Sequence, residues 1–150
     1  MTVGKSGLIM RIVNERICEL NVCKEFLMSK IPGRQNWIFP DCELPPSGDF
    51  PLKGHESVIV LNPGLEKAEI LLTFYFTDKH PIQNINVSVE AERVRCFRMD
   101  KPEEIGGVVI PRETQYALSL KSSVPVVVQY GRLDTRDQPM AFYINTGYFE

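Results

Sequence analysis

Alternating apolar and polar residues predict β-strands over most of the chain. Residues 66–78 give the clearest pattern, since every second position from Ala68 to Phe76 is apolar and Glu69 and Thr73 stand between them. Neighbouring side chains of a strand point to opposite faces, so this alternation indicates one buried face. The same pattern continues in residues 84–99, with Ile85, Val87, Val89 and Ala91 on the inward face. Further strands are predicted at 55–62, 106–111, 115–122, 124–134 and 140–149.

Turn-forming residues separate these segments. Clusters containing proline, glycine or aspartate occur at 62–66, 78–81, 100–104 and 137–139. About eight short strands at this spacing, with no convincing helix between them, are typical of an antiparallel sandwich or barrel. Parallel units are excluded because their crossover connections need about a dozen residues or more. We therefore expect an all-β fold, an antiparallel β-sandwich of about eight strands.

The first 28 residues differ from the rest of the chain. Their apolar residues are spaced irregularly and are separated by charges, so the helical pattern is imperfect. One interpretation is a short helical extension, residues 1–28, before a sandwich domain at 29–150. The other is an error in the start site, with Met28 as the true first residue. The sequence leaves both open.

Composition narrows the class of protein. The 150 residues suit one domain, and 17 basic against 19 acidic residues give a net charge of −2. This balance disfavours nucleic acid as a partner, and no apolar run approaches the roughly 18 residues that membrane insertion needs. The four cysteines form no C-x-x-C pair and only two histidines occur, so zinc-ligand spacing is absent. Reduced thiols in the cytoplasm are the expectation.

Motifs for catalysis are missing. The chain lacks G-x-S-x-G, a phosphate-binding loop, a dinucleotide fingerprint and H-E-x-x-H. His55 and Glu56 could form an acid–base pair, but adjacent residues of a strand face opposite sides, which weakens that interpretation. We therefore expect no enzymatic activity, no catalytic residues, no cofactor and no metal.

Charged residues follow the apolar strand 124–134, in the stretch "GRLDTRDQP". Alternation places Arg132 on the same face as Val126 and Val128. A buried arginine needs a carboxylate, for which Glu56 and Asp134 are candidates. Arg132 is then either a donor for a polar ligand or half of a structural ion pair, unless the strand ends earlier and leaves it in solvent. Asp134 has the same ambiguity between a turn with solvated charges and a ligand-binding loop.

Several motifs occur together in one order. They are W-x-x-P-D at 37–41, "PPSG" at 45–48, G-H-E at 54–56, Y-F-x-D at 75–78, A-x-R at 91–93, and V-P-V-V-V-Q with R-L-D-T-R at 124–136. Over about residues 36–149 the chain resembles the sensory rhodopsin transducer family. The resemblance implies a cytoplasmic β-sandwich protein that assembles as a homotetramer and relays a signal. It also implies binding of a small polar ligand, with sugars among the candidates, and leaves room for a protein signalling partner.

The function expected from this resemblance is non-catalytic small-molecule binding or signal transduction. The alternatives are a scaffold for a protein partner and, less favoured, an enzyme for a sugar-like substrate. The family signature transfers to nine candidate ligand-binding residues: Trp37, His55, Glu56, Asn62, Arg93, Gln129, Arg132, Asp134 and Arg136. Trp37 would supply a stacking ring, and Glu56 the counter-charge of Arg132. Independently, residues 140–149 place aromatic side chains on both faces of a strand, which favours an oligomer.

Overall fold

The computed structural model describes residues 31–136 and 140–150 and confirms the all-β class. Every strand pairing in it is antiparallel. The predicted extension at residues 1–28 lies outside the described residues. The elements are β1 (Arg34–Glu43), β2 (His55–Asn62), β3 (Ala68–Phe76), β4 (Ile82–Val89), β5 (Arg93–Arg98), the 3-10 helix η1 (Pro102–Glu104), β6 (Gln115–Asp134), β7 (Ala141–Asn145) and β8 (Tyr148–Phe149).

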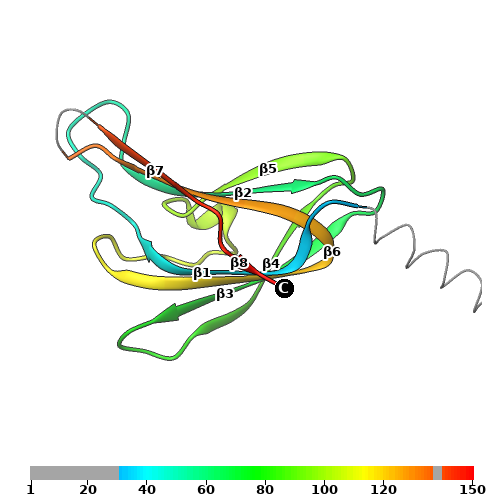
Figure 1. The fold of residues 1–150 in the computed structure, drawn as a ribbon. Coiled ribbons are helices and arrows are strands. Elements are labelled where there is room, and N and C mark those ends of the chain that lie inside the picture. Colours follow the sequence, from blue (N-terminus) through cyan, green and yellow to red (C-terminus); the bar gives the residue numbers. More distant parts are fainter. Residues whose placement is uncertain (1–30, 137–139) are drawn as a thin grey trace, which may run out of the picture. The chain divides into compact units, whose positions relative to one another are not determined.

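Strand β6 belongs to both layers of the sandwich (Figure 1). Its first half lies in the order β4-β3-β6-β1-β8, and its second half pairs with β2 and β7, with β5 beyond β2. Ser122 is opposite Ile70 of β3, whereas Val127 is opposite Leu61 of β2. Hydrogen bonding therefore joins all eight strands into one sheet, which folds over on itself at β6.

The change of layer explains why the sequence predicts two strands where the structure has one. Pro125 lies at the change of partners and lacks the N–H group that a central strand position needs. Gly33 packs against the same point with φ of +123°, and a Cβ atom there would lie 2.5 Å from the carbonyl oxygen of Val126. Only glycine combines that backbone angle with so close an approach.

The core lies between the two layers. The inward face of β3 is the predicted one, with Ala68, Ile70, Leu72 and Phe74 at most 1% exposed. The inward residues of β6 continue the core through both layers: Tyr116, Leu118, Leu120, Val124, Val126, Val128 and Tyr130. Each large apolar side chain buried in this way contributes about 1.5–3 kcal/mol. Because every second residue of β6 points inward, this alternation also determines which side chains point inward at the C-terminal end of the strand.

Two predicted strands, at 84–99 and 140–149, are each two strands in the structure, the latter β7 and β8. Residues 84–99 contain most of β4 and all of β5, which are separated by a turn at residues 90–92. Glu92 has φ of +54°, and its backbone N–H donates to the carbonyl oxygen of Gly64 at 3.0 Å. Ala91 therefore lies in a turn rather than on an inward strand face.

The segment 106–111 is a loop, and its predicted strand is wrong. It follows η1, and Gly106 and Gly107 have φ of +67° and +83°. Two of its apolar residues, Val108 and Ile110, are still buried, whereas Val109 between them is 70% exposed. Across residues 31–136 and 140–150, no helix has the length and apolar character needed to cross a membrane.

Candidate functional site

Glu56 is the centre of a buried polar cluster at one end of the sandwich. Its side chain is 0% exposed. Its carboxylate accepts hydrogen bonds from the backbone N–H of Glu43 at 2.7 Å, the hydroxyl of Tyr116 at 2.6 Å, and the hydroxyl of Tyr130. These partners come from β1 and both halves of β6. We call Glu56, Tyr116, Tyr130 and Arg132 the Glu56 cluster, which joins the two layers.

Arg132 faces inward, as the alternation of β6 predicts. It lies opposite Glu56 in the register of β6 and β2. Its Nε lies 3.5 Å from a carboxylate oxygen of Glu56, and its side chain is 22% exposed. The predicted ion pair is therefore present. Among the described residues, the buried Nε has no hydrogen-bond acceptor, and Glu56 is its ion-pair partner.

The electrostatics keep the two tyrosines of the cluster and the neighbouring Cys42 thiol neutral. Burial raises the pKa of Tyr116 and Tyr130, and the negative charge of Glu56 raises each further. Burial and Glu56 raise the pKa of the Cys42 thiol for the same reasons. Burial alone would lower the pKa of Arg132, but Tyr130 and Glu56 outweigh it and raise that pKa. At neutral pH, the cluster thus contains two neutral tyrosine hydroxyls and the cation Arg132. The neighbouring Cys42 is a thiol and not a thiolate nucleophile.

Asp134 and Arg136 form a turn next to the cluster. Asp134 accepts hydrogen bonds from the backbone N–H of Arg136 at 3.0 Å and from its guanidinium at 2.5–3.1 Å. The hydrogen bond from Arg136 holds the pKa of Asp134 below its ordinary value. The carboxylate of Asp134 is therefore engaged within its own turn, and Arg136 is the exposed member of the pair.

Two predicted residues lie on the opposite face of the same layer. His55 precedes Glu56 in β2 and faces outward, with its Nδ1 2.8 Å from the carbonyl oxygen of Lys53. Gln129 also faces outward, opposite Ile59 of β2. Strand alternation separates both side chains from the Glu56 cluster.

Asn62 and Arg93 lie at the far end of β2, roughly 20 Å along the strand from Glu56. Asn62 is fully buried, and its amide nitrogen donates to the carbonyl oxygens of Glu66, Val89 and Glu90 at 2.8–3.2 Å. Its amide oxygen accepts from the N–H of Gly64 at 3.0 Å. The side chain therefore fixes the β2–β3 turn against the end of β4. Arg93 is exposed.

Trp37 lies in the core near that same end. It is 5% exposed, and its indole N–H donates to the carbonyl oxygen of Arg34 at 3.1 Å. Its ring centroid lies 5.1 Å from that of Phe149 on β8. Of the nine predicted residues, the structure thus gathers Glu56, Arg132, Asp134 and Arg136 at one end.

Tyr116 and Tyr130 belong to the cluster but are not among the site residues predicted from the sequence. Both lie on the inward face of β6, and a buried tyrosine hydroxyl requires a partner. The sequence signal for their polar role was Glu56, a carboxylate at an inward position of β2 that needs buried donors. Tyr143 of β7 was also missed, and the register places it opposite Arg132 on the side away from Glu56.

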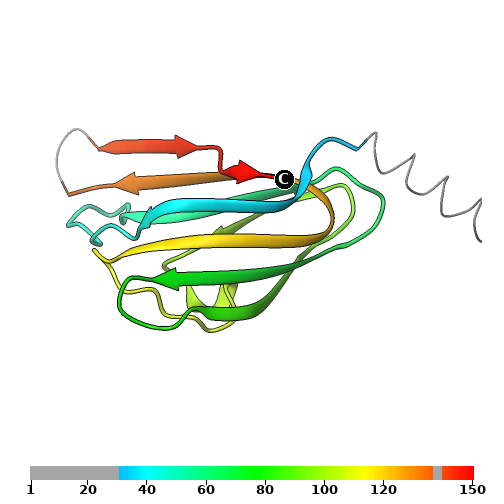
Figure 2. The ribbon, with the colours of Figure 1, turned by 60° about the horizontal axis from the view of Figure 1, so that its bottom comes forward.

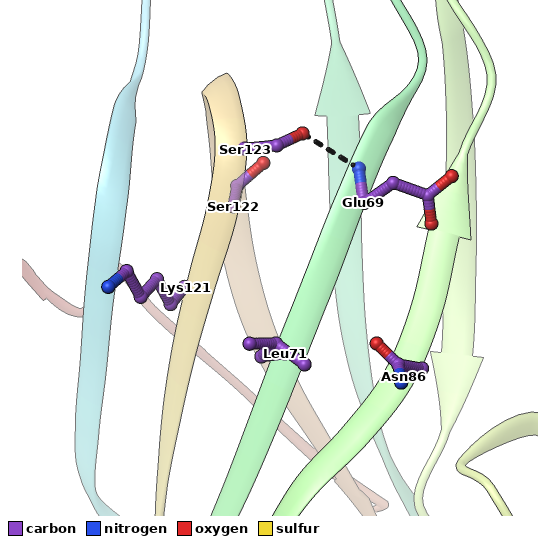
Figure 3. Close-up of a pocket in the computed structure, with 6 residues that line it drawn as sticks. All are labelled: Glu69, Leu71, Asn86, Lys121, Ser122 and Ser123. Atoms are coloured by element: carbon purple, nitrogen blue, oxygen red, sulfur yellow. Dashed lines mark hydrogen bonds between the residues drawn. The ribbon is translucent and has the colours of Figure 1, made fainter.

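Two of the depressions on the described part of the surface lie away from these residues. One, of about 270 Å³, is on the outer face of β3, β4 and β6, lined by Glu69, Leu71, Asn86, Lys121, Ser122 and Ser123 (Figure 3). In Figure 3, Leu71 lies between Lys121 and Asn86, and the Lys121 side chain extends away from the other residues. The other, of about 200 Å³, lies beside η1. Neither includes a predicted site residue. Among the residues that the structure describes, no three histidine, cysteine, aspartate or glutamate side chains group to hold a metal.

Comparison with known families supports the resemblance of the motifs. The family described as Anabaena sensory rhodopsin transducer matches residues 32–149. The chain belongs to the sensory rhodopsin transducer family. This confirms the resemblance predicted from the motifs, and the matched region coincides with the described sandwich.

Two solved structures are similar to this family member. Protein 1070 of Thermotoga maritima is 33% identical, with a TM-score of 0.70, and the match covers 79% of this chain and 96% of that one. The Anabaena sensory rhodopsin transducer is 31% identical, with a TM-score of 0.54, covering 66% of this chain and 96% of that one. No curated protein matches the chain.

Proposed function

We propose that the protein is a non-catalytic relay in signal transduction that acts by binding and assembles as a homo-oligomer. Family membership supports the general role. The observation that carries the assembly is the apolar surface of β7 and β8, which we call the C-terminal surface.

Large apolar side chains dominate the C-terminal surface. Both strands have an edge that no other described strand covers, and Figure 2 shows them in red along one side of the sandwich. Adjacent residues of β7 point to opposite faces, so both faces are apolar. Uncovered apolar edges of this kind mark sites of association. The side chains are 47–61% exposed: Phe142, Tyr143, Ile144, Tyr148 and Phe149.

A homotetramer fits this arrangement and the family resemblance. Strand β7 is at the edge of one layer, and β8 is at the edge of the other. One chain therefore has two separate edges through which it can contact two neighbours, as a tetramer with two kinds of interface requires.

Ile144→Glu tests this role of the C-terminal surface. The substitution places a charge on β7 at a site that is 58% exposed, so the isolated fold should tolerate it. Size-exclusion chromatography with light scattering should show dissociation to smaller species. Leu65→Glu is the matched control, since Leu65 is 82% exposed in the β2–β3 connection, outside both edges. An Ile144→Glu protein with the mass of the wild type would contradict the proposal.

A second function, binding of a small polar ligand such as a sugar or sugar acid, is supported by one feature of Arg132. Its buried Nε lacks an acceptor among the described residues, while part of the side chain reaches solvent. Tyr143 lies opposite it in register. A ligand at Arg132 would therefore lie next to the strand that carries the proposed assembly surface.

A thermal-shift screen against sugars, sugar acids and phosphosugars tests this second function. A ligand that binds only the folded state stabilises it by about 2.7 kcal/mol at a hundredfold excess over its Kd. The thermal shift caused by a ligand found in the screen should be smaller in Arg132→Lys and absent in Arg132→Ala. The lysine variant keeps a charge beside Glu56, which guards against loss of the fold. No hit, or a hit that Arg132→Ala leaves unchanged, would refute a ligand site at Arg132.

The same proposal includes a cytoplasmic location and a protein signalling partner. Cys42 and Cys96 are unpaired thiols in the described sandwich, which fits a reducing compartment. The partner would contact part of the C-terminal surface that the oligomer leaves exposed. We do not expect nucleic acid as a partner, because the net charge is −2.

A further inference from the structure

The open depression of about 200 Å³ beside η1, which we call the cavity, lies between the chain that follows β1 and the chain that follows β5. Leu44, Met99 and Ile110 form its apolar walls and are at most 6% exposed. Val109 also lines it and is 70% exposed, which places Val109 at the mouth. Asp100 and Arg112 supply the charged lining. Apolar walls with a few convergent polar groups are typical of small-molecule sites.

The guanidinium of Arg112 is held in place by the backbone. Its Nη1 donates to the carbonyl oxygens of Pro45 and Gly54, the latter at 3.0 Å. Its Nη2 lies 3.9 Å from a carboxylate oxygen of Asp100, too far for a hydrogen bond. Because Nη1 alone satisfies the backbone contacts, the outer edge of the guanidinium keeps donors in a fixed orientation that suits a carboxylate.

The charges around the cavity do not balance. Asp100 accepts two hydrogen bonds from Arg98, at 2.8 and 2.9 Å, so its carboxylate is already matched by that guanidinium. Arg112 is then the second cation beside one carboxylate. The side chain of Arg112 is 32% exposed and that of Asp100 is 12% exposed, so solvent compensates this excess only in part. This excess of positive charge favours binding of an anion in the cavity.

The cavity is also linked to the Glu56 cluster. The N–H of Met99 donates to the carbonyl oxygen of Glu56 at 3.0 Å, and the N–H of Glu113 donates to that of Leu44 at 2.8 Å. The residue before Leu44 is Glu43, whose N–H donates to the Glu56 carboxylate. A wall of the cavity is thus one residue away from Glu43, which donates to the carboxylate at the centre of the Glu56 cluster.

We propose that this cavity binds a small carboxylic acid with a branched apolar tail. The carboxylate would accept from the free edge of Arg112, and the tail would contact Leu44 and Ile110. A volume below the roughly 300–1,000 Å³ of drug-sized sites limits the ligand to a few carbon atoms. The site is separate from Arg132 and from the C-terminal surface, so it stands or falls independently of the function proposed above.

Calorimetric titration of the full chain with 3-methylbutanoate tests the proposal. Acetate keeps the carboxylate without the tail, and 3-methylbutanamide keeps the shape without the charge. We expect 3-methylbutanoate to bind at millimolar concentration or below, about tenfold or more tighter than either, because the charged hydrogen bond and the apolar tail each add to affinity. Equal binding of the amide, or no binding of the acid, would overturn the proposal.

Val109→Phe separates a ligand site from a purely structural role of Arg112. The larger ring should obstruct the mouth and abolish binding of 3-methylbutanoate while leaving the Arg112 contacts intact. Val94→Phe, at a position 63% exposed on β5, is the matched control and should bind like the wild type. Unchanged binding in Val109→Phe would place the acid elsewhere and refute this site.

Discussion

Replacing Glu56 by glutamine tests whether its charge joins the two layers. Glutamine keeps the size of the side chain but exchanges one carboxylate oxygen for an NH₂ donor. One oxygen of Glu56 accepts from Glu43 and Tyr130, and the other accepts from Tyr116. The substitution turns one of these acceptors into a donor that faces another donor. It also leaves Arg132 without its counter-charge.

The expected loss of stability follows from those contacts. A hydrogen bond to a charged group contributes about 1.5–3 kcal/mol. Removing one partner of a buried ion pair costs about 3–5 kcal/mol. Because the Arg132 side chain is 22% exposed, water compensates part of the lost pairing, and the lower end applies. We expect Glu56→Gln to lower the free energy of unfolding by about 3 kcal/mol, a large share of the 5–15 kcal/mol of a typical domain.

Urea unfolding at one fixed protein concentration is the appropriate assay. Trp37, the sole tryptophan and 5% exposed, reports loss of the core by fluorescence. Glu103→Gln is the matched control, because Glu103 is exposed in η1 and should change stability little. A Glu56→Gln protein within about 1 kcal/mol of the wild type, with an unchanged urea dependence, would refute the role given to the Glu56 charge.

Three further predictions concern single residues. Asn62→Ala should destabilise by about 2 kcal/mol or more in urea unfolding, since it leaves buried backbone groups without partners; Asn62→Asp, which would place a carboxylate oxygen against buried carbonyl oxygens, should not recover the loss. Gly33→Ala should lower the melting temperature, because its Cβ would meet the carbonyl oxygen of Val126 at 2.5 Å; an unchanged temperature would contradict that contact. Burial would raise the pKa of Asp100, but Arg98 outweighs it and lowers that pKa below its ordinary 3.8. The unfolded chain then binds this proton more tightly, so the Asp100 contribution should be complete above about pH 5 and lost as the pH falls below 4; Asp100→Asn should flatten that part of the pH–stability curve.

The sequence predicted features that depend on local alternation. The buried face of β3 and the inward direction of Arg132 follow from strand geometry alone, and both agree with the structure. The separation of His55 from Glu56 follows from the same rule. These predictions needed no knowledge of which strands pair.

Features that depend on pairing between distant segments could not be predicted. The continuity of β6 depends on Gly33, about 90 residues away in the chain, which packs against Val126. The turn at residues 90–92 depends on Asn62, whose amide binds carbonyl oxygens there. The contacts of Glu56 with Tyr116 and Tyr130 arise only because β6 crosses both layers. In each case the deciding contact joins residues that no local pattern relates.

The mass of the native full-length chain in solution tests the proposed assembly most directly. One chain has a mass of 17.1 kDa. Light scattering across a range of micromolar concentrations should give a multiple of that mass, four chains for the proposed tetramer, and the multiple should fall in Ile144→Glu. A mass of 17.1 kDa at every concentration would show that the C-terminal surface stays uncovered by other copies and would contradict the proposal.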